Sequence, residues 1–213
     1  IICGDSYSND GDVTGNHGGT DFWIVKLDAV GNLVWQKAYG GSSNEYPSIL
    51  QQTEDEGFIV VGYSGSNDGD VSGNQGLGDV WIIKLNPVGD LIWQKSFGGS
   101  GDEGGYSIFQ SIVGGFLIAG WSTSNDGDVV GNNGGDGDFW IIKMDDSGII
   151  EWQSCFGGTN IDAATQVQET MEGDVIIGGY SWSNDGDVSL NHGLVDFWVV
   201  KLENNNTGIL SLP

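Results

Sequence analysis

Carboxylate and amide side chains recur in one short phrase of this chain, and oxygen donors of this kind are the ligands that calcium prefers. The phrase is SNDGDV, and its copies begin at Ser8, Ser66, Ser124 and Ser183. Each copy, with its flanking residues, offers three aspartates and one asparagine as candidate ligands. They are Asp10, Asp12, Asn16 and Asp21; Asp68, Asp70, Asn74 and Asp79; Asp126, Asp128, Asn132 and Asp138; and Asp185, Asp187, Asn191 and Asp196.

The same phrase has an architectural interpretation, and the sequence favours it. The pattern N-D-G-D lacks the spacing of an EF-hand loop. Asn67-Asp68-Gly69-Asp70 is typical of an Asx-type turn, in which glycine takes a positive φ and side-chain oxygens cap backbone amides. Two carboxylates about 5 Å apart repel each other by only about 0.8 kcal/mol in water, so an exposed loop tolerates both. Calcium binding stays open as the alternative.

The histidines offer little catalytic chemistry. His17 and His192 occupy a loop position that Gln75 and Asn133 occupy in the other copies. A catalytic or zinc-binding histidine is not interchangeable in this way, so we expect exposed polar loop residues. No grouping of histidine, cysteine and serine predicts nucleophilic catalysis, and the chain is predicted not to be an enzyme. The competing class is an enzyme that acts on polysaccharide through loop carboxylates.

One loop position varies among the copies instead of repeating. Tyr7, Gly65, Thr123 and Trp182 occupy it, just before the acidic phrase. Tyr7 and Trp182 are candidate ligand-binding residues, because an exposed aromatic ring can stack on a sugar ring or on a partner side chain. Neutral drift is the alternative. A binding pocket should break the repeat symmetry with clustered aromatic side chains, whereas a structural spacer should not.

The elements that position these residues repeat about every 58 residues. Trp23, Trp81, Trp140 and Trp198 are separated by 58, 59 and 58 residues. Such self-similarity indicates one repeat array, a single domain without a linker. We expect a first repeat at about 1–41 that lacks its first strand, followed by repeats at about 42–99, 100–158 and 159–213.

One complete repeat predicts four strands, at 106–110, 116–121, 139–144 and 149–156, with turn residues between them. The third strand is a continuous apolar run, which predicts that both of its faces are covered. Short four-stranded sheets of this kind predict an all-β propeller of antiparallel blades, with a β-solenoid as the alternative. The last repeat ends in a weak fourth strand at 209–212, and closure of the ring is left open.

The topology of such blades predicts an acidic face. The loop between the second and third strands emerges at the same end as the connection that leads into the next first strand. The loop carries SNDGDV, and the connection carries Glu45, Glu103 and Asp162 at one repeat position. We therefore expect the two sets of carboxylates to lie together at one end of the molecule.

Composition limits the partners. The chain has 213 residues, with 30 acidic residues against six lysines and a net charge of −24. Such a surface repels nucleic acid and anionic lipid, so we expect neither nucleic-acid binding nor membrane insertion. An aromatic content of 11% argues against disorder. Cys3 and Cys155 fall at small-residue positions in different repeats, which favours two free thiols.

The repeated phrases also resemble a known family. The segment Asp79-Val80-Trp81-Ile82-Ile83-Lys84-Leu85, the run from Gly89 to Lys95 and Phe97-Gly98-Gly99, with the SNDGDV phrase, are similar to the β-propeller repeats of secreted bacterial surface proteins. Members of that family commonly end in a sorting domain of the type IX secretion pathway. The resemblance covers almost the whole chain and implies a propeller fold and export from the cell.

The functional expectation combines these observations. We expect a secreted or cell-surface binding or adhesion module without catalytic activity, whose ligand is a carbohydrate or a protein and whose one candidate cofactor is calcium. A structural spacer within a large surface protein is a further alternative. The chain begins without methionine in the middle of a repeat, so we expect a longer precursor with any signal peptide outside this sequence.

Overall fold

The computed structural model describes residues 1–204 and the backbone of residues 210–211. Its regular secondary structure consists of strands, with no helix in the described part of the chain. The strands form four separate antiparallel sheets, which confirms the predicted all-β class. A membrane-spanning helix, long and apolar, is likewise not found among these residues.

The sheets follow the repeats, and we number them as blades 1 to 4. Blade 1 contains β1 (Ile2–Ser6), β2 (Asp21–Leu27) and β3 (Leu33–Tyr39). Blade 2 contains β4 (Glu45–Gln52), β5 (Phe58–Ser64), β6 (Asp79–Leu85) and β7 (Leu91–Phe97). Blade 3 contains β8 (Glu103–Gln110), β9 (Phe116–Ser122), β10 (Asp138–Met144) and β11 (Ile150–Phe156). Blade 4 contains β12 (Asp162–Glu169), β13 (Val175–Ser181), β14 (Asp196–Asn204) and β15 (Leu210–Ser211).

Each blade is a meander in which consecutive strands pair. The predicted strands of blade 3 are confirmed, although its first strand begins at Glu103 and not at Tyr106. The tight turn between the first two strands is built on Gly114 and Gly115, whose φ angles of 95° and 70° favour glycine. In blade 4 the weak strand expected at 209–212 appears as β15, and residues 209 and 212 lie outside the described residues.

The first strand of every complete blade contains a β-bulge. The pairing register shifts between Pro47 and Ile49 in β4, between Gly105 and Ser107 in β8, and between Ala164 and Gln166 in β12. A bulge leaves one residue unpaired and re-aims its side chain. In blade 3 that residue is Tyr106.

The hydrophobic core lies between the blades, in three clusters that each join two consecutive sheets. Trp81 and Trp140 of the third strands are 0% and 1% exposed. The Trp81 ring centroid lies 4.7 Å from that of Phe22 in the preceding blade. A buried tryptophan contributes roughly 4 to 6 kcal/mol of gross transfer free energy, so this column stabilises the contacts between blades.

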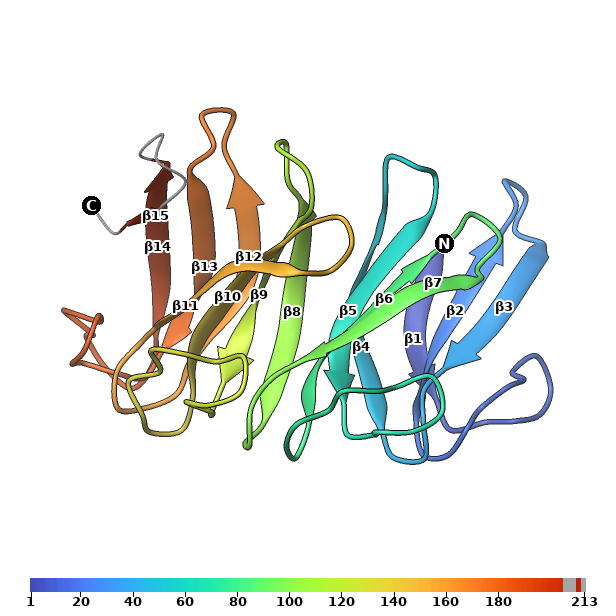
Figure 1. The fold of residues 1–213 in the computed structure, drawn as a ribbon, viewed down its shortest axis with the longest axis horizontal. Helices are drawn as coiled ribbons and strands as arrows, with labels where there is room; N and C mark the ends of the chain where they lie inside the picture. The colour runs from blue at the N-terminus through green and yellow to red at the C-terminus, as the bar shows by residue number, and fades with distance from the viewer. Residues whose placement is uncertain (205–209, 212–213) are drawn as a thin grey trace.

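The four blades form an open array. Figure 1 shows them side by side, with blade 1 and blade 4 at opposite ends of the row. Neighbouring first strands contact each other, β4 with β8 and β8 with β12, as the inner strands of a propeller do. The fold is propeller-like, and none of the described sheets closes on another.

The covering of the third strands differs along the array. Every residue of β6 and β10 is buried, as the continuous apolar run predicts. In β14 the expectation of two covered faces is wrong, because Phe197 and Val199 are 78% and 51% exposed. The difference has a simple cause, since blade 4 is packed against a neighbour on one face alone in the described structure.

Candidate functional site

The acidic loop of each of blades 2 to 4 lies against the connection that enters the same blade from the preceding one. We call residues 40–44, 98–102 and 157–161 the entry connections. In blade 2 the Asp68 carboxylate accepts the N–H of Ser42 at 2.7 Å, and the Ser66 hydroxyl accepts that of Ser43 at 2.9 Å. The Asp70 N–H donates to the Gly40 carbonyl at 2.9 Å. The expectation that loop and connection lie together is confirmed.

The same hydrogen bonds recur in the later blades. Asp126 accepts the N–H of Ser100 at 2.7 Å, and Asp185 accepts the N–H of Thr159 at 2.8 Å. These backbone donors lower the pKa values of both carboxyls and of Asp68, because they stabilise the ionised form. The first aspartate of each of these phrases therefore joins two segments of the chain.

The Asx-turn interpretation of the phrase is partly right. Gly69 has a φ of 65°, and the Val71 N–H donates to the Asp68 carbonyl at 3.0 Å, so the phrase does form a glycine-dependent turn. The Asn67 side chain also caps its own loop by accepting the Gly73 N–H at 2.9 Å. The Asp68 side chain, however, caps the entry connection and not its own turn.

The later asparagine fixes the loop to the end of the second strand. Asn74 Nδ2 donates to the Ser64 carbonyl at 3.0 Å, and its Oδ1 accepts the Gly76 N–H at 3.0 Å. Asn16, Asn132 and Asn191 make the equivalent bonds to Ser6, Ser122 and Ser181. This asparagine has the same structural role in all four copies.

A pair of buried carboxyls lies beneath each junction between blades. The pairs are Asp21 with Glu45, Asp79 with Glu103, and Asp138 with Asp162, and all six residues are 0% exposed. A Cβ atom placed on Gly98 would lie 2.6 Å from Asp79 Oδ1 and 2.4 Å from Glu103 Oε2. Both carboxyls therefore crowd the same glycine, and any side chain there would displace them.

Two of these buried aspartates have pKa values above the usual range of a carboxyl. Burial, with the neighbouring charge of Glu103, raises the pKa of Asp79 to about 7. Burial and Asp162 raise the pKa of Asp138 to about 6. One oxygen of each aspartate accepts a backbone N–H from its own loop, at 3.0 and 2.6 Å, while the buried Oδ1 has no hydrogen-bond partner in the described structure.

The predicted calcium ligands divide among these roles. In blade 2, Asp68 bonds the entry connection, Asn74 bonds β5, and Asp79 is buried at the junction. Within residues 1–204, no three His, Cys, Asp or Glu side chains group in a way that could hold a metal ion. Calcium takes six to eight oxygen ligands, so a bound ion would have to recruit backbone carbonyls or water. Calcium binding stays a prediction.

The histidine position links neighbouring blades. The His17 ring Nδ1 lies 2.8 Å from Asp21 Oδ2, and its Nε2 lies 3.8 Å from Asp70 of blade 2. At the same position Gln75 donates to Asp128 at 2.7 Å, and Asn133 donates to Asp187 at 3.0 Å. These polar residues are more than exposed loop side chains, because they connect one acidic loop to the next.

A row of aromatic side chains runs across the first and second strands of the blades. We call this row the aromatic track, and it consists of Tyr7, Tyr46, Tyr63, Tyr106, Trp121 and Tyr180. The rings of Tyr46 and Tyr63 stack with centroids 6.1 Å apart. Burial and the neighbouring Tyr7 raise the pKa of Tyr46, which places the predicted residue Tyr7 at one end of the track. Tyr7 is 72% exposed.

Two cavities lie along the aromatic track and share Tyr106 and Trp121. The first, of about 310 Å³, lies between blades 2 and 3 and is also lined by Tyr46 and Tyr63. The second, of about 240 Å³, lies between blades 3 and 4 and is also lined by Tyr180. The two cavities therefore lie next to each other, with the side chains of Tyr106 and Trp121 common to both.

The sequence of blade 3 explains why the first cavity is open. Tyr106 is the bulged residue of β8, and Gly104 and Gly105 precede it. A Cβ atom on Gly104 would lie 2.6 Å from Trp121 Nε1, so glycine leaves room for that ring. The equivalent positions in β4 and β12 carry Tyr46-Pro47 and two alanines. The second predicted ligand residue, Trp182, is 43% exposed and is not among the residues that line either cavity.

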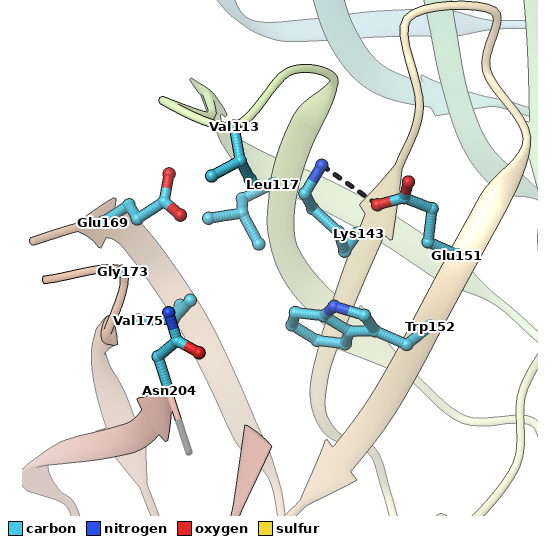
Figure 2. Close-up of a pocket in the computed structure, with 9 residues that line it drawn as sticks. All are labelled: Val113, Leu117, Lys143, Glu151, Trp152, Glu169, Gly173, Val175 and Asn204. Atoms are coloured by element: carbon cyan, nitrogen blue, oxygen red, sulfur yellow. Dashed lines mark ion pairs between the residues drawn. The ribbon is translucent and has the colours of Figure 1, made fainter. Parts of the chain in front are cut away.

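A further cavity, of about 370 Å³, lies elsewhere between blades 3 and 4. Figure 2 shows its lining, with Lys143 directed toward Glu151 and the ring of Trp152 below them. Lys143 Nζ lies 3.2 Å from Glu151 and donates to the Gly114 carbonyl at 2.6 Å. In blade 1 the residue equivalent to Trp152 is Trp35, and the turn of blade 2 at Gly89 covers its ring. In blade 4 the residues equivalent to this turn fall within 205–209, which lie outside the described residues. We therefore assign this cavity no ligand.

Comparison of the sequence with models of known protein families and with curated proteins finds no match to either.

The track is the part of the site that the sequence analysis missed, apart from Tyr7. Its signal was present as departures from the repeat. Tyr46 stands where the other blades have Gly104 and Ala163, and Tyr106 stands where they have Ser48 and Thr165. Two aromatic substitutions in adjacent first strands would have indicated a shared surface between blades 2 and 3.

Proposed function

We propose that this chain is a non-catalytic binding module whose ligand is a carbohydrate, held along the aromatic track. The observation that carries the proposal is the pair of cavities that share Tyr106 and Trp121. Tyr46 and Tyr106 come from non-equivalent repeat positions, so the track breaks the symmetry of the array. A structural spacer has no need of such a break.

The chemistry of the track suits sugar rings. Tyr46, Tyr106 and Tyr180 are 42%, 39% and 36% exposed, so part of each residue is accessible to a ligand, and an aromatic ring can stack on a sugar ring. Pockets of this kind pair apolar surface with a few polar groups that set orientation. The Tyr63 hydroxyl, 3.5 Å from Asp102, and Asp136 in the second cavity are suitable partners for sugar hydroxyls.

Charge narrows the class of carbohydrate. The chain carries a net charge of −24, and Asp102 and Asp136 lie beside the track. An acidic polysaccharide would meet repulsion along the whole surface, whereas a neutral or basic glycan would not. We infer a neutral glycan as the ligand, with a protein as the alternative partner.

The carboxylates support a non-catalytic assignment. Asp162, which lines the second cavity, is 0% exposed and accepts hydrogen bonds from the Gly158 N–H and the Ser183 hydroxyl, both at 2.8 Å. Its repeated counterparts Glu45 and Glu103 accept the same kind of bond at the other junctions. Repetition of this role at every junction indicates architecture and not a unique catalytic acid.

We further infer that the module acts outside the cell, as part of an exported surface protein. The similarity of its phrases to propeller repeats of secreted bacterial proteins supports this, and export by the type IX pathway is the corresponding expectation. Calcium is proposed as a stabilising ion and not as part of the carbohydrate site, since the track contains none of its predicted ligands.

The test is a binding titration with neutral oligosaccharides, read by tryptophan fluorescence and calorimetry. We expect a panel of glucan, xylan and chitin oligomers to contain at least one ligand, and Y106A and W121A to weaken its binding at least tenfold. M171S, which alters a side chain that is 91% exposed and lines neither cavity, is the control and should bind normally. Equal binding by all variants would place the site elsewhere, and hydrolysis of the bound glycan would overturn the non-enzymatic assignment.

A further inference from the structure

The two cavities of the aromatic track share two rings but differ in the charge of their linings. Tyr106 and Trp121 line both cavities. The first cavity is otherwise lined by tyrosine, serine and glycine residues, none of which is charged. The second is lined by the carboxyls of Asp136 and Asp162 and by no basic residue of the described structure. The same two rings therefore border an uncharged space on one side and an acidic space on the other.

Asp136 is a departure from the repeat. Between the loop asparagine and the first aspartate of the third strand, blade 3 has five residues where each of the other blades has four. Asp136 is the one carboxylate in any of these four segments, and it is exposed. The carbonyl of the next residue, Gly137, accepts the Asp162 N–H at 2.7 Å. The longer loop thus adds a carboxylate to the second cavity, next to a hydrogen bond that joins the loop to β12.

Asp162 also differs from its repeat counterparts. Glu45 and Glu103 each accept a serine hydroxyl of the second strand through Oε1, at 2.8 Å in both cases. The Asp162 side chain is one methylene shorter, and its Oδ1 is buried without a hydrogen-bond partner in the described structure. An acceptor without a donor leaves its negative potential uncompensated. From its buried position, Asp162 therefore reinforces the negative potential that Asp136 brings from the loop.

Three aromatic side chains complete the second cavity. They are Tyr106, Trp121 and Tyr180. Burial and the neighbouring Tyr106 raise the pKa of the Tyr180 phenol, so the two phenols lie close together and Tyr180 stays uncharged. The faces of aromatic rings attract cations, and tryptophan does so most strongly. A neutral sugar can donate a hydroxyl hydrogen bond to a carboxylate, but only a cation gains from both the carboxylates and the ring faces.

We propose that the second cavity binds a protonated amine, and that the glycan of the aromatic track carries this group on the sugar that occupies the cavity. The inference rests on the proposed function, because it names the sugar that one part of the proposed site selects. The sugar in the first cavity is neutral, since the lining there is uncharged. The net charge of −24 favours the approach of a cation anywhere on the surface, whereas the lining of the second cavity fixes the place. Asp136 is thus the expected specificity-determining residue.

The test compares two trimers by titration calorimetry at about pH 6.5, where an amine of ordinary basicity is protonated. The N-acetylglucosamine trimer is neutral, and the glucosamine trimer is the same chain with free amino groups. We expect the glucosamine trimer to bind roughly tenfold more tightly, and D136N to remove most of that preference. E172Q removes the same charge from an exposed side chain that lines neither cavity, and it should keep the preference.

A pair of ring substitutions assigns the preference to one of the two cavities. Tyr180 lines the second cavity and not the first, whereas Tyr46 lines the first and not the second. Y180L should therefore reduce the preference for the amine, and Y46L should weaken the binding of both trimers alike. Each variant should keep the tryptophan emission of the parent chain, which shows that folding is not the cause.

Three results would overturn the inference. They are equal or tighter binding of the acetylated trimer, a preference that D136N leaves unchanged, and binding of neither trimer. The proposed function survives each of them if W121A still weakens the binding of a neutral oligosaccharide, and it fails if no neutral oligosaccharide binds. A trilysine peptide that binds more tightly than the glucosamine trimer, and loses this affinity in D136N, would contradict the assignment to a sugar and indicate a protein partner.

Discussion

The acidic phrase of blade 1 and that of blade 2 share the letters SNDGDV but have different surroundings. In blade 2 the phrase holds an entry connection through Asp68 and the backbone of Asp70. In blade 1 the equivalent Asp10 accepts a hydroxyl from Ser8 in the same loop. The same six residues thus stabilise a junction in blade 2 and lie at the edge of the array in blade 1. The role of the phrase depends on the neighbouring blade.

The last blade shows the same contrast for the buried carboxyls. Asp79 is packed against Glu103 of the next blade, and its pKa is raised to about 7. Asp196 occupies the same repeat position in blade 4, and hydrogen bonds from His192 lower its pKa. Equivalent residues therefore shift in opposite directions, because one is covered by a neighbour and the other is not. Paired substitutions at equivalent positions can separate the contribution of the junction from that of the blade.

The largest effect is expected from the pair D79N and D196N. A folded-state pKa of about 7 means that the folded chain binds more protons than the unfolded chain between about pH 4 and pH 7. The contribution of Asp79 to the free energy of unfolding is therefore fully present below about pH 4 and is lost as the pH rises through about 7. D79N mimics the protonated form and should raise the free energy of unfolding at pH 8 by up to about 4 kcal/mol, with little change near pH 4.

Urea denaturation followed by tryptophan fluorescence at pH 4.5 and pH 8 measures this difference. D196N is the control, and because the pKa of Asp196 is lowered, it should bring no gain at pH 8. A gain from D196N as large as that from D79N would show that net charge, and not burial at the junction, controls the pH dependence.

A smaller effect is expected from G69A and G11A. Both glycines have a φ near 65°, so alanine at either position is strained by about 1–2 kcal/mol. A Cβ atom on Gly69 would also lie 2.4 Å from the Gly40 carbonyl oxygen, whereas one on Gly11 would meet nothing within 4 Å. We expect G69A to lower the free energy of unfolding by roughly 3–4 kcal/mol, about twice the loss for G11A. Equal losses in urea denaturation would mean that turn strain alone accounts for the glycine.

Local patterns explain what the sequence predicted well. The turn glycines, the apolar third strands and the tryptophan period all act within one repeat, and the four sheets follow from them. The nearness of acidic loop and entry connection followed from antiparallel topology. The exact partner of Asp68 did not, because an aspartate at the first position of a turn can cap either its own loop or a neighbouring segment.

The aromatic track was missed because patterns within one repeat do not reveal it, and its signal appears only when equivalent positions of successive blades are compared. Tyr106 is aimed into the cavities by a bulge in β8, and nothing in its immediate sequence marks a bulge. Trp121 shares a repeat position with Tyr63 and Tyr180, so the sequence indicated a structural role for its ring. The structure brings these rings together from blades 2, 3 and 4. The buried carboxyl pairs were missed for the same reason, since each pair joins residues of successive blades.

The smallest effect is expected from D68A compared with D10A, and it also tests calcium. Asp68 accepts an N–H of the entry connection, so D68A should lower the Tm by about 2–4 °C, as loss of a capping side chain does. D10A should change the Tm by less than about 1 °C, because in the described structure the Asp10 carboxylate is hydrogen-bonded within its own loop. Scanning calorimetry in a chelator and again in millimolar calcium measures both effects.

If the loops bind calcium, the ion should raise the Tm of the parent chain, and each variant should lose part of that gain. A Tm that is independent of calcium in all three proteins would leave hydrogen bonding to the entry connection as the whole role of Asp68.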